Sequence, residues 1–206
     1  MINLEKDNGL WIVTINRPDK ANSLTEEMLV ELARIAEAAH EDARVFVLTG
    51  EGKVFSAGAD LEAARAGLAT SAVWERLSSA IAGFPGLSIT ALNGTVAGGA
   101  MGMVLACDLR IAAKGAKAFY PVMKLGFLPQ PSDPGRLTRL VGPSRAKMIL
   151  MGGQKVTDQE ALSWGLFDRV VPAEELMPSV REIAEDTLGA DAIHVATIKG
   201  MCRPAP

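Results

Sequence analysis

Two glycine-rich turns are the first features of this sequence that suggest chemistry. They are GEGKVFSAGADLEAA at residues 50–64 and NGTVAGGAMGMVLACDLRIAA at residues 93–113. Each follows an apolar run typical of a buried strand and leads into a predicted helix. A helix N-terminus presents unpaired N–H groups with a partial positive charge, and glycine lets a ligand approach the backbone. Two such turns could aim two N–H groups at one oxygen atom, as an oxyanion hole does. The alternative for each turn is tight packing of a helix on a strand, which also requires glycine.

The sequence does not support a nucleotide-binding loop, a disulfide framework, a metal site or a catalytic histidine. Neither the phosphate-binding pattern GxxxxGK[ST] nor the dinucleotide-binding pattern GxGxxG is present. Cys107 and Cys202 form neither a CxxC pair nor a disulfide framework. His40 and His194 lie far apart in the sequence and are expected to sit on helices without a catalytic role. We therefore expect no metal site.

The composition is that of one globular domain. The chain has 206 residues, of which 49% are hydrophobic and 22% charged, enough for a sizeable core. A formal net charge of −3 gives no electrostatic reason to expect nucleic-acid binding. No apolar run reaches the roughly 18 residues that a membrane span needs, and the opening MINLEKDNGLWIVTI does not resemble a signal peptide. We therefore expect a cytoplasmic protein with neither nucleic-acid nor membrane partners.

Strands and helices are expected to alternate along the chain. Short apolar or β-branched runs predict strands at residues 10–16, 44–50, 87–94, 109–113 and 167–171. Helical spacing predicts helices between them, one opened by a capping box at Ser23, another by one at Thr157, and a last one near Ala173. Asp133 followed by Pro134 predicts an N-cap and first-turn pair. This order predicts an α/β fold of parallel ββα-type units with strands buried on both faces.

Four consecutive motifs resemble the crotonase superfamily of enoyl-CoA hydratases and isomerases. They are VFSAGADL, ALNGTVAGGAMGMVLACDLRIAA, LGFLPQPSDPGRLTRLVG and MGGQKVTDQEALSWGLFDRVV, and VTINRPDKANSLTEEM near the start also matches. The resemblance implies a crotonase-type spiral of ββα units with a shortened helical C-terminal part. Within one domain, we expect a spiral core with the acyl-CoA site at residues 1–143 and a short helical C-terminal region at residues 144–206.

The resemblance also implies a coenzyme A thioester as the ligand, no other cofactor, and a homotrimer or hexamer. The thioester carbonyl would lie between the backbone N–H groups of Ala59, in SAGAD, and Gly99, in AGGAMG. An enolate formed beside a thioester needs its oxygen stabilised, and two N–H donors do this without a side chain. The substrate would also be bound by Lys20, Ala21, Asn22, Ser23, Ala57, Gly58, Asp60, Leu61, Gly98, Gly102 and Val122.

Two of these positions depart from the hydratase pattern of the family. Hydratases add water with two glutamates, and the corresponding positions here are Gly102 and Val122. No glutamate occurs between Glu75 and Glu160, so the departure does not depend on the register of the match. A general acid or base typically contributes about 10²–10⁴-fold, and one oxyanion donor about 10²–10³-fold. The sequence therefore predicts a protein that keeps the oxyanion hole but is not an efficient hydratase.

The acids that remain in this span have structural interpretations. Asp108 matches a structural aspartate of the family, and Asp158 lies in the first turn of a predicted helix. Asp133 is the best candidate for an acid or base, because its loop faces the acyl pocket in the family, although a helix cap is a sufficient and favoured explanation for it. The aromatic candidates for the pocket lining hint only at an apolar acyl chain. They are Trp74, Phe84, Phe119 and Tyr120.

Two functions from different classes therefore remain. The first is a lyase, isomerase or hydrolase that acts on an acyl-CoA of fatty acid metabolism through an enolate. Decarboxylation needs no base, whereas isomerisation and thioester hydrolysis need one. The second is a catalytically silent crotonase-fold protein that binds acyl-CoA or serves in assembly. The glycine turns favour the first function. Gly102, Val122 and the shortened C-terminal part, which would leave the adenine side of the groove open or covered by a neighbouring subunit, favour the second.

Overall fold

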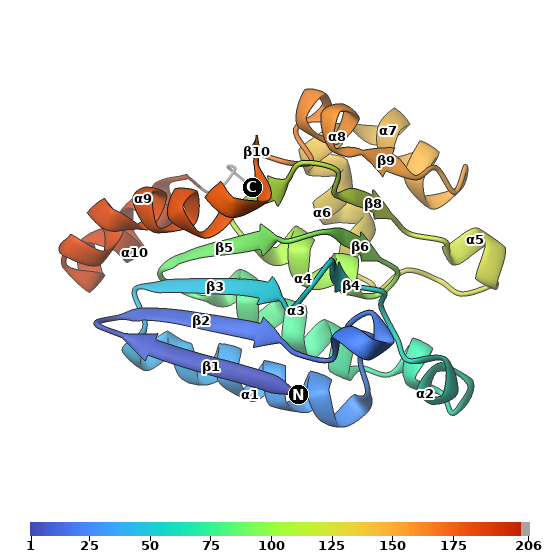
Figure 1. The fold of residues 1–206 in the computed structure, drawn as a ribbon, viewed down its shortest axis with the longest axis horizontal. Coiled ribbons are helices and arrows are strands. Elements are labelled where there is room, and N and C mark those ends of the chain that lie inside the picture. Colours follow the sequence, from blue (N-terminus) through green and yellow to red (C-terminus); the bar gives the residue numbers. More distant parts are fainter. Residues whose placement is uncertain (203–206) are drawn as a thin grey trace.

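The large sheet has six strands and lies between two layers of helices (Figure 1). A computed structural model of the chain describes residues 1–202. The outermost strand is antiparallel to its neighbour, and all other neighbours are parallel. In spatial order the strands are β1 (Ile2–Asp7), β2 (Leu10–Ile15), β3 (Val45–Gly50), β5 (Leu87–Leu92), β7 (Leu109–Ala113) and β10 (Arg169–Val171).

A second, smaller sheet is formed by the short strands that follow the strands of the first. Its order is β4 (Val54–Ser56), β6 (Thr95–Ala97), β8 (Lys117–Phe119) and β9 (Val156–Thr157). The first three of these strands pair in parallel, and β9 pairs antiparallel to β8. Because β3, β5 and β7 are each followed by one short strand and then by a helix, the chain repeats a ββα unit. The predicted α/β fold is therefore confirmed.

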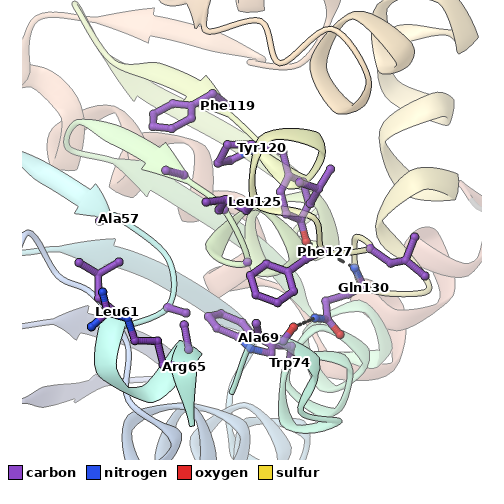
Figure 2. Close-up of a pocket in the computed structure, with 18 residues that line it drawn as sticks. Ala57, Leu61, Arg65, Ala69, Trp74, Phe119, Tyr120, Leu125, Phe127 and Gln130 are labelled. Atoms are coloured by element: carbon purple, nitrogen blue, oxygen red, sulfur yellow. Dashed lines mark hydrogen bonds between the residues drawn. The ribbon is translucent and has the colours of Figure 1, made fainter. Parts of the chain in front are cut away.

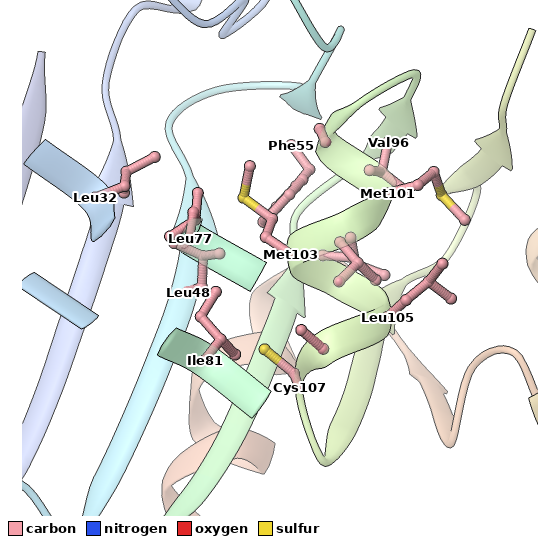
Figure 3. Close-up of a cluster of buried hydrophobic side chains, with 14 of the residues drawn as sticks. Leu32, Leu48, Phe55, Leu77, Ile81, Val96, Met101, Met103, Leu105 and Cys107 are labelled. Carbon is pink, nitrogen blue, oxygen red and sulfur yellow. The ribbon is translucent and has the colours of Figure 1, made fainter. Parts of the chain in front are cut away.

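Helices bury both faces of the large sheet. On one face pack α1 (Glu26–Asp42), α3 (Val73–Gly83) and α4 (Ala100–Ala106), and on the other packs α9 (Leu176–Gly189). Phe46 and Leu48 of β3 point into the first cluster, whereas Val45 and Val47 point into the second. This division explains why β3 is apolar along its length: both of its faces are covered. Figure 3 shows Leu48 beside Leu77, Ile81 and Met103 in the first cluster.

The remaining helices are short and lie mostly around the small sheet and the C-terminal end of the chain (Figure 1). They are α2 (Leu61–Arg65), α5 (Val122–Leu125), α6 (Asp133–Val141), α7 (Pro143–Leu150), α8 (Asp158–Trp164) and α10 (Ala192–Met201), with 3-10 turns at Pro18–Lys20, Leu68–Thr70 and Ala173–Glu175. The helix expected near Ala173 thus begins with a 3-10 turn and continues as α9 from Leu176. Over residues 1–202, no helix is both long and apolar enough to cross a membrane.

One of the two predicted capping boxes is confirmed and the other is wrong. The Thr157 hydroxyl accepts a hydrogen bond from the backbone N–H of Glu160, and the Glu160 side chain accepts one from the N–H of Thr157. At α1, however, the N-cap is Thr25, whose hydroxyl accepts from the N–H of Met28. Ser23 is held elsewhere, because its hydroxyl accepts from the guanidinium of Arg17.

Asn22 fixes the segment that leads into α1. It is fully buried and has a left-handed φ of 53°, a conformation that asparagine tolerates better than most residues. Its amide nitrogen donates to the carbonyl oxygens of Glu51 at 2.9 Å and Val54 at 2.6 Å, and its amide oxygen accepts from the N–H of Arg17 at 2.8 Å. Asn22 therefore ties residues 17–24 to the turn between β3 and β4.

We expect the Asn22→Ala substitution to lower the free energy of unfolding by roughly 2 kcal/mol or more, because each buried partner left without a hydrogen bond costs about 1–3 kcal/mol. Urea denaturation measures the loss. Asn8→Ala is the matched control: Asn8 also has a left-handed φ, of 47°, but it is exposed and its side chain bonds only to Asp7. Equal losses in the two variants would show that backbone conformation, and not the buried hydrogen bonds, accounts for the effect.

Candidate functional site

The two glycine turns meet at one edge of the small sheet. The first turn follows β4 and the second follows β6, and these strands are parallel neighbours, so their carboxyl ends open at the same place. Gly58 and Gly98 have φ of +89° and +58°, which favour glycine. A Cβ on Gly58 would lie 2.7 Å from the carbonyl oxygen of Ala97 and 3.4 Å from the nitrogen of Gly99. The two turns are therefore in direct contact.

The bridge between Leu24 and Ala59 sets the direction of the Ala59 amide. The N–H of Leu24 donates to the carbonyl of Gly58 at 2.8 Å, and the carbonyl of Leu24 accepts from the N–H of Asp60 at 2.9 Å. In such a parallel bridge, the N–H of the middle residue, Ala59, points to the opposite side. Gly99 directly precedes the first residue of α4. Within residues 1–202, neither Ala59 nor Gly99 donates its N–H to a hydrogen bond.

An apolar cavity of about 380 Å³ adjoins both turns (Figure 2). Ala59 and Gly99 line it, together with Trp74 of α3 and with residues of β8, of α5 and of the loops on either side of α5. The members of this second group are Phe119, Tyr120, Pro121, Val122, Leu125, Phe127, Leu128 and Gln130. Trp74 is fixed by a hydrogen bond of 2.8 Å from its indole N–H to the carbonyl of Leu68, and its ring covers the Cα of Gly99.

Three of the four aromatic residues expected in the pocket lie there, and Phe84 does not. Phe84 belongs to the core, where its ring centroid lies 6.0 Å from that of Phe46. Phe84 and Trp74 are ten residues apart at the two ends of α3, which corresponds to roughly 15 Å at 1.5 Å per residue. The two side chains therefore reach different regions.

A second cavity, of about 680 Å³, continues from the first on the side of α1 and α2. Both cavities are lined by Ala57, Ala59 and Leu61. Of the residues expected to bind coenzyme A, the larger cavity is lined by Lys20, Ser23, Ala57, Asp60 and Leu61. Asn22 lies beneath the surface, and Ala21, Asn22 and Gly58 do not line this cavity. The two predicted segments are thus brought together, although only some of their side chains face the space between them.

The Arg17 guanidinium lies 2.8 Å from the Asp60 carboxylate at this second cavity. Its hydrogen bond to Asp60 lowers the pKa of that carboxyl below the usual range, and hydrogen bonds from the N–H groups of Ala63 and Glu62 add to the effect. Asp60 in turn caps α2, because its other oxygen accepts from Glu62 at 3.0 Å. Arg17 was not foreseen from the sequence; its partner lies 43 residues away, so no local pattern reveals the pair.

The two positions at which the resemblance places the family glutamates, Gly102 and Val122, differ in their surroundings. Val122 lines the apolar cavity, whereas Gly102, inside α4, does not. A Cβ on Gly102 would lie 2.9 Å from one carboxylate oxygen of Asp133 and 3.1 Å from the other. The space that a side chain at position 102 would need is therefore taken by a carboxylate from α6.

Asp133 is not the helix cap that the sequence predicts. Ser132 holds the N-cap position of α6, and no side chain caps this helix. The Asp133 carboxylate is instead fully buried, where its Oδ2 accepts a hydrogen bond of 2.9 Å from the Tyr120 hydroxyl. Its Oδ1 lies 3.9 Å from Nη1 of Arg136 and has no hydrogen-bond partner within residues 1–202. Burial raises the pKa of Asp133 to about 6, against the opposing effects of Tyr120 and Arg136.

Asp133 reaches the cavity only through Tyr120, because Tyr120 lines the cavity and Asp133 does not. Sequence reasoning considered both residues but did not pair them, since 13 residues separate them and the spacing has no helical or strand periodicity. The other two acids are structural, as expected. Asp108 accepts from the N–H and hydroxyl of Ser88, each at 2.8 Å, and Asp158 accepts from the N–H of Gly115 at 2.8 Å.

Comparison with known proteins confirms the resemblance. The fold is that of crotonase-type enoyl-CoA hydratases: a crystal structure of an enoyl-CoA hydratase from Bacillus anthracis superposes with a TM-score of 0.89 at 34% identity, over 97% of this chain and 81% of that one. The family model for enoyl-CoA hydratase/isomerase matches residues 5–204, and the chain belongs to that family. Crotonyl-CoA hydratase of Syntrophomonas wolfei is 35% identical over 95% of this chain and 78% of its own length. Carnitinyl-CoA dehydratase of Escherichia coli is 32% identical over 98% and 80%.

The contact between Asp133 and Gly102 predicts an energetic coupling of the two positions. In a helix alanine is favoured over glycine by about 1 kcal/mol. In the wild type, we expect the Gly102→Ala substitution not to raise the free energy of unfolding, because the new methyl group meets the Asp133 carboxylate. In the Asp133→Ala background, we expect the same substitution to raise the free energy of unfolding. Denaturant unfolding of all four proteins should give a coupling of about 1–2 kcal/mol. Gly200→Ala, in the open part of α10, is the control and should behave alike in both backgrounds.

The raised pKa of Asp133 predicts a specific dependence of stability on pH. The folded protein holds this proton more tightly than the unfolded chain, whose carboxyl has a pKa of 3.8. The contribution of Asp133 to the free energy of unfolding is therefore full below about pH 4 and is lost as the pH rises to about 6. The quantity to measure is the difference between the wild type and Asp133→Asn from pH 4 to 7. A difference that stays constant over this range would contradict the assigned pKa.

Proposed function

We propose that this protein binds an acyl-CoA thioester and stabilises its enolate with the backbone N–H groups of Ala59 and Gly99. The observation that supports this proposal is the meeting of the two glycine turns at an apolar cavity that continues into a second, larger one. The acyl chain would occupy the apolar cavity, beside Gly98 and Val122, whereas Gly102 does not line this cavity. The coenzyme A would run through the larger cavity, along residues 20–23 and 57–61. The names of the relatives, two of which are a crotonyl-CoA hydratase and a carnitinyl-CoA dehydratase, support the choice of ligand.

The proposed reaction is one that relies on the enolate more than on a pair of carboxylates. Hydration needs an acid and a base, each typically worth about 10²–10⁴-fold, and neither Gly102 nor Val122 can carry a proton. Decarboxylation and isomerisation remain as reactions that form an enolate, in the lyase and isomerase classes. Thioester hydrolysis, in the hydrolase class, would use the same two N–H groups for a tetrahedral oxyanion. Asp133 is the candidate acid or base of this proposal and would act through Tyr120, to which it is hydrogen-bonded; a homotrimer or hexamer is the proposed assembly. No metal ion takes part.

The competing proposal is a catalytically silent acyl-CoA-binding or assembly protein. The complete burial of Asp133 favours it, because a carboxylate that does not line the cavity cannot touch a substrate directly. A panel of crotonyl-, 3-enoyl-, malonyl- and aroyl-CoA, assayed beside calorimetric binding of coenzyme A, separates the two. Turnover of any thioester supports the enzyme, and binding without turnover supports the silent protein. Absence of binding would refute both acyl-CoA proposals.

The oxyanion role of Gly99 can be tested with a pair of variants. Gly99 has φ of −58°, which proline adopts, so Gly99→Pro removes the N–H without changing this angle. Gly99→Ala is the matched control, since it adds the same Cβ, 3.1 Å from the Trp74 ring, and retains the N–H. We expect turnover by Gly99→Pro to fall about 10²–10³-fold below that of Gly99→Ala. Equal activity of the two variants would remove this amide from the mechanism.

A further inference from the structure

The lining of the apolar cavity contains one side chain that can both release and recover a proton. Of its polar side chains, the Arg65 guanidinium can only donate hydrogen bonds, the Gln130 amide does not titrate, and the Trp74 indole N–H already donates to Leu68. Tyr120 is the remaining polar residue of the lining. A reaction that forms an enolate must move a proton or protonate a carbanion at the α-carbon, so this hydroxyl is the group to consider.

The Tyr120 hydroxyl links two different surroundings. It accepts a hydrogen bond of 3.4 Å from the backbone N–H of Gln130, which lines the cavity, and it donates to Oδ2 of Asp133 behind the cavity wall. Figure 2 shows Tyr120 between Phe119 and Phe127 on the same side of the cavity. Burial, first, and then the nearby Asp133 raise the pKa of Tyr120 well above its usual range, so the phenol stays neutral. A neutral phenol can accept a proton only if a partner takes the phenolic proton, and it can donate its proton only if a partner replaces that proton.

Asp133 has the features of that partner. One of its oxygens is engaged by Tyr120, and the other is buried without a hydrogen bond in the described residues. The charged groups that face it are Arg136 of α6, at 3.9 Å, and Glu75 of α3, which accepts hydrogen bonds from the N–H and hydroxyl of Ser132. Because desolvation outweighs the attraction of Arg136, both the neutral and the ionised forms of Asp133 are accessible near neutral pH.

We propose that Tyr120 is the catalytic residue that exchanges a proton with the α-carbon of the bound thioester, and that Asp133 is the positioning residue that takes and returns that proton. To form the enolate, the α C–H bond breaks and its electron pair moves toward the thioester carbonyl. The proton goes to the Tyr120 oxygen while the phenolic proton passes to Oδ2 of Asp133. In the reverse direction the enolate carbon takes the phenolic proton, and protonated Asp133 restores the phenol. No oxidant or further reactant is required. Because the enolate is the shared intermediate, this role rests on the function proposed above.

Hydrogen–deuterium exchange at the α-carbon tests the transfer directly. The wild type is incubated with butyryl-CoA in D₂O, and deuterium incorporation is followed by mass spectrometry while thioester binding is measured by calorimetry. We expect Tyr120→Phe and Asp133→Asn each to slow exchange by 10²-fold or more while the dissociation constant changes little. Thr49→Val is the matched control: it also removes a buried hydroxyl, one that donates to the Ala91 carbonyl at 2.8 Å in the large sheet, and should exchange like the wild type.

The pH profile provides a measurement that does not depend on how the variants fold. Exchange by the wild type should rise with pH and level off above about 6, because only ionised Asp133 can accept the proton. A wild-type profile without this inflection overturns the role of Asp133. Unchanged exchange by Tyr120→Phe, or a wild type that binds butyryl-CoA without exchanging its α-protons, overturns the role of Tyr120 but leaves thioester binding intact. A wild type that does not bind the thioester at all refutes the proposed function itself.

Discussion

The parallel pairing of β4 with β6 is the constraint on which the candidate site depends. It places the ends of two strands that are far apart in the sequence side by side. The segments that follow the two strands must therefore both turn immediately, in the same small space. A side chain at Gly58 would collide with the carbonyl of Ala97, and this is why the turn is built from glycine. The Leu24 bridge then holds the first glycine turn against the segment before α1, and the hydrogen bonds of Asn22 hold that segment to the turn between β3 and β4. The free direction of the Ala59 amide follows from the Leu24 bridge and needs no side chain.

A second constraint is volume. The Asp133 carboxylate, which comes from α6, occupies the space that a side chain at Gly102 of α4 would need. The position of this carboxylate affects what it can do chemically. A carboxylate on Gly102 would project from the helix that begins beside the Gly99 amide, whereas the Asp133 carboxylate lies behind the Tyr120 ring. Replacing Gly102 with glutamate alone would therefore create crowding and charge repulsion instead of a second catalytic acid.

The sequence was informative wherever short-range physics decides the structure. The buried strands, the amphipathic helices and the Thr157 cap follow from periodicity and local hydrogen bonding, and the family motifs locate the two turns. It failed where a long-range contact outweighs a local preference. Ser23 is drawn from its expected cap to Arg17, and Asp133 from its expected cap to Tyr120. Phe84 packs in the core because it lies at the C-terminal end of α3, far from the cavity. The residue types alone do not reveal this distance between Phe84 and the cavity.

The surroundings of Asp133 also bear on whether the site is active or silent. Asp108, a structural aspartate, is surrounded by donors from Ser88 and Lys199 and is half exposed, so its charge is well compensated. Asp133 is fully buried with one oxygen unpartnered in the described residues, an arrangement that typically costs about 1–3 kcal/mol or more. Two apolar side chains in place of Tyr120 and Asp133 would fill the same volume without that penalty. A buried acid with one carboxylate oxygen lacking a hydrogen bond in the described residues, beside a ligand-sized cavity, is a feature that packing does not explain, and the proposed proton transfer through Tyr120 accounts for it.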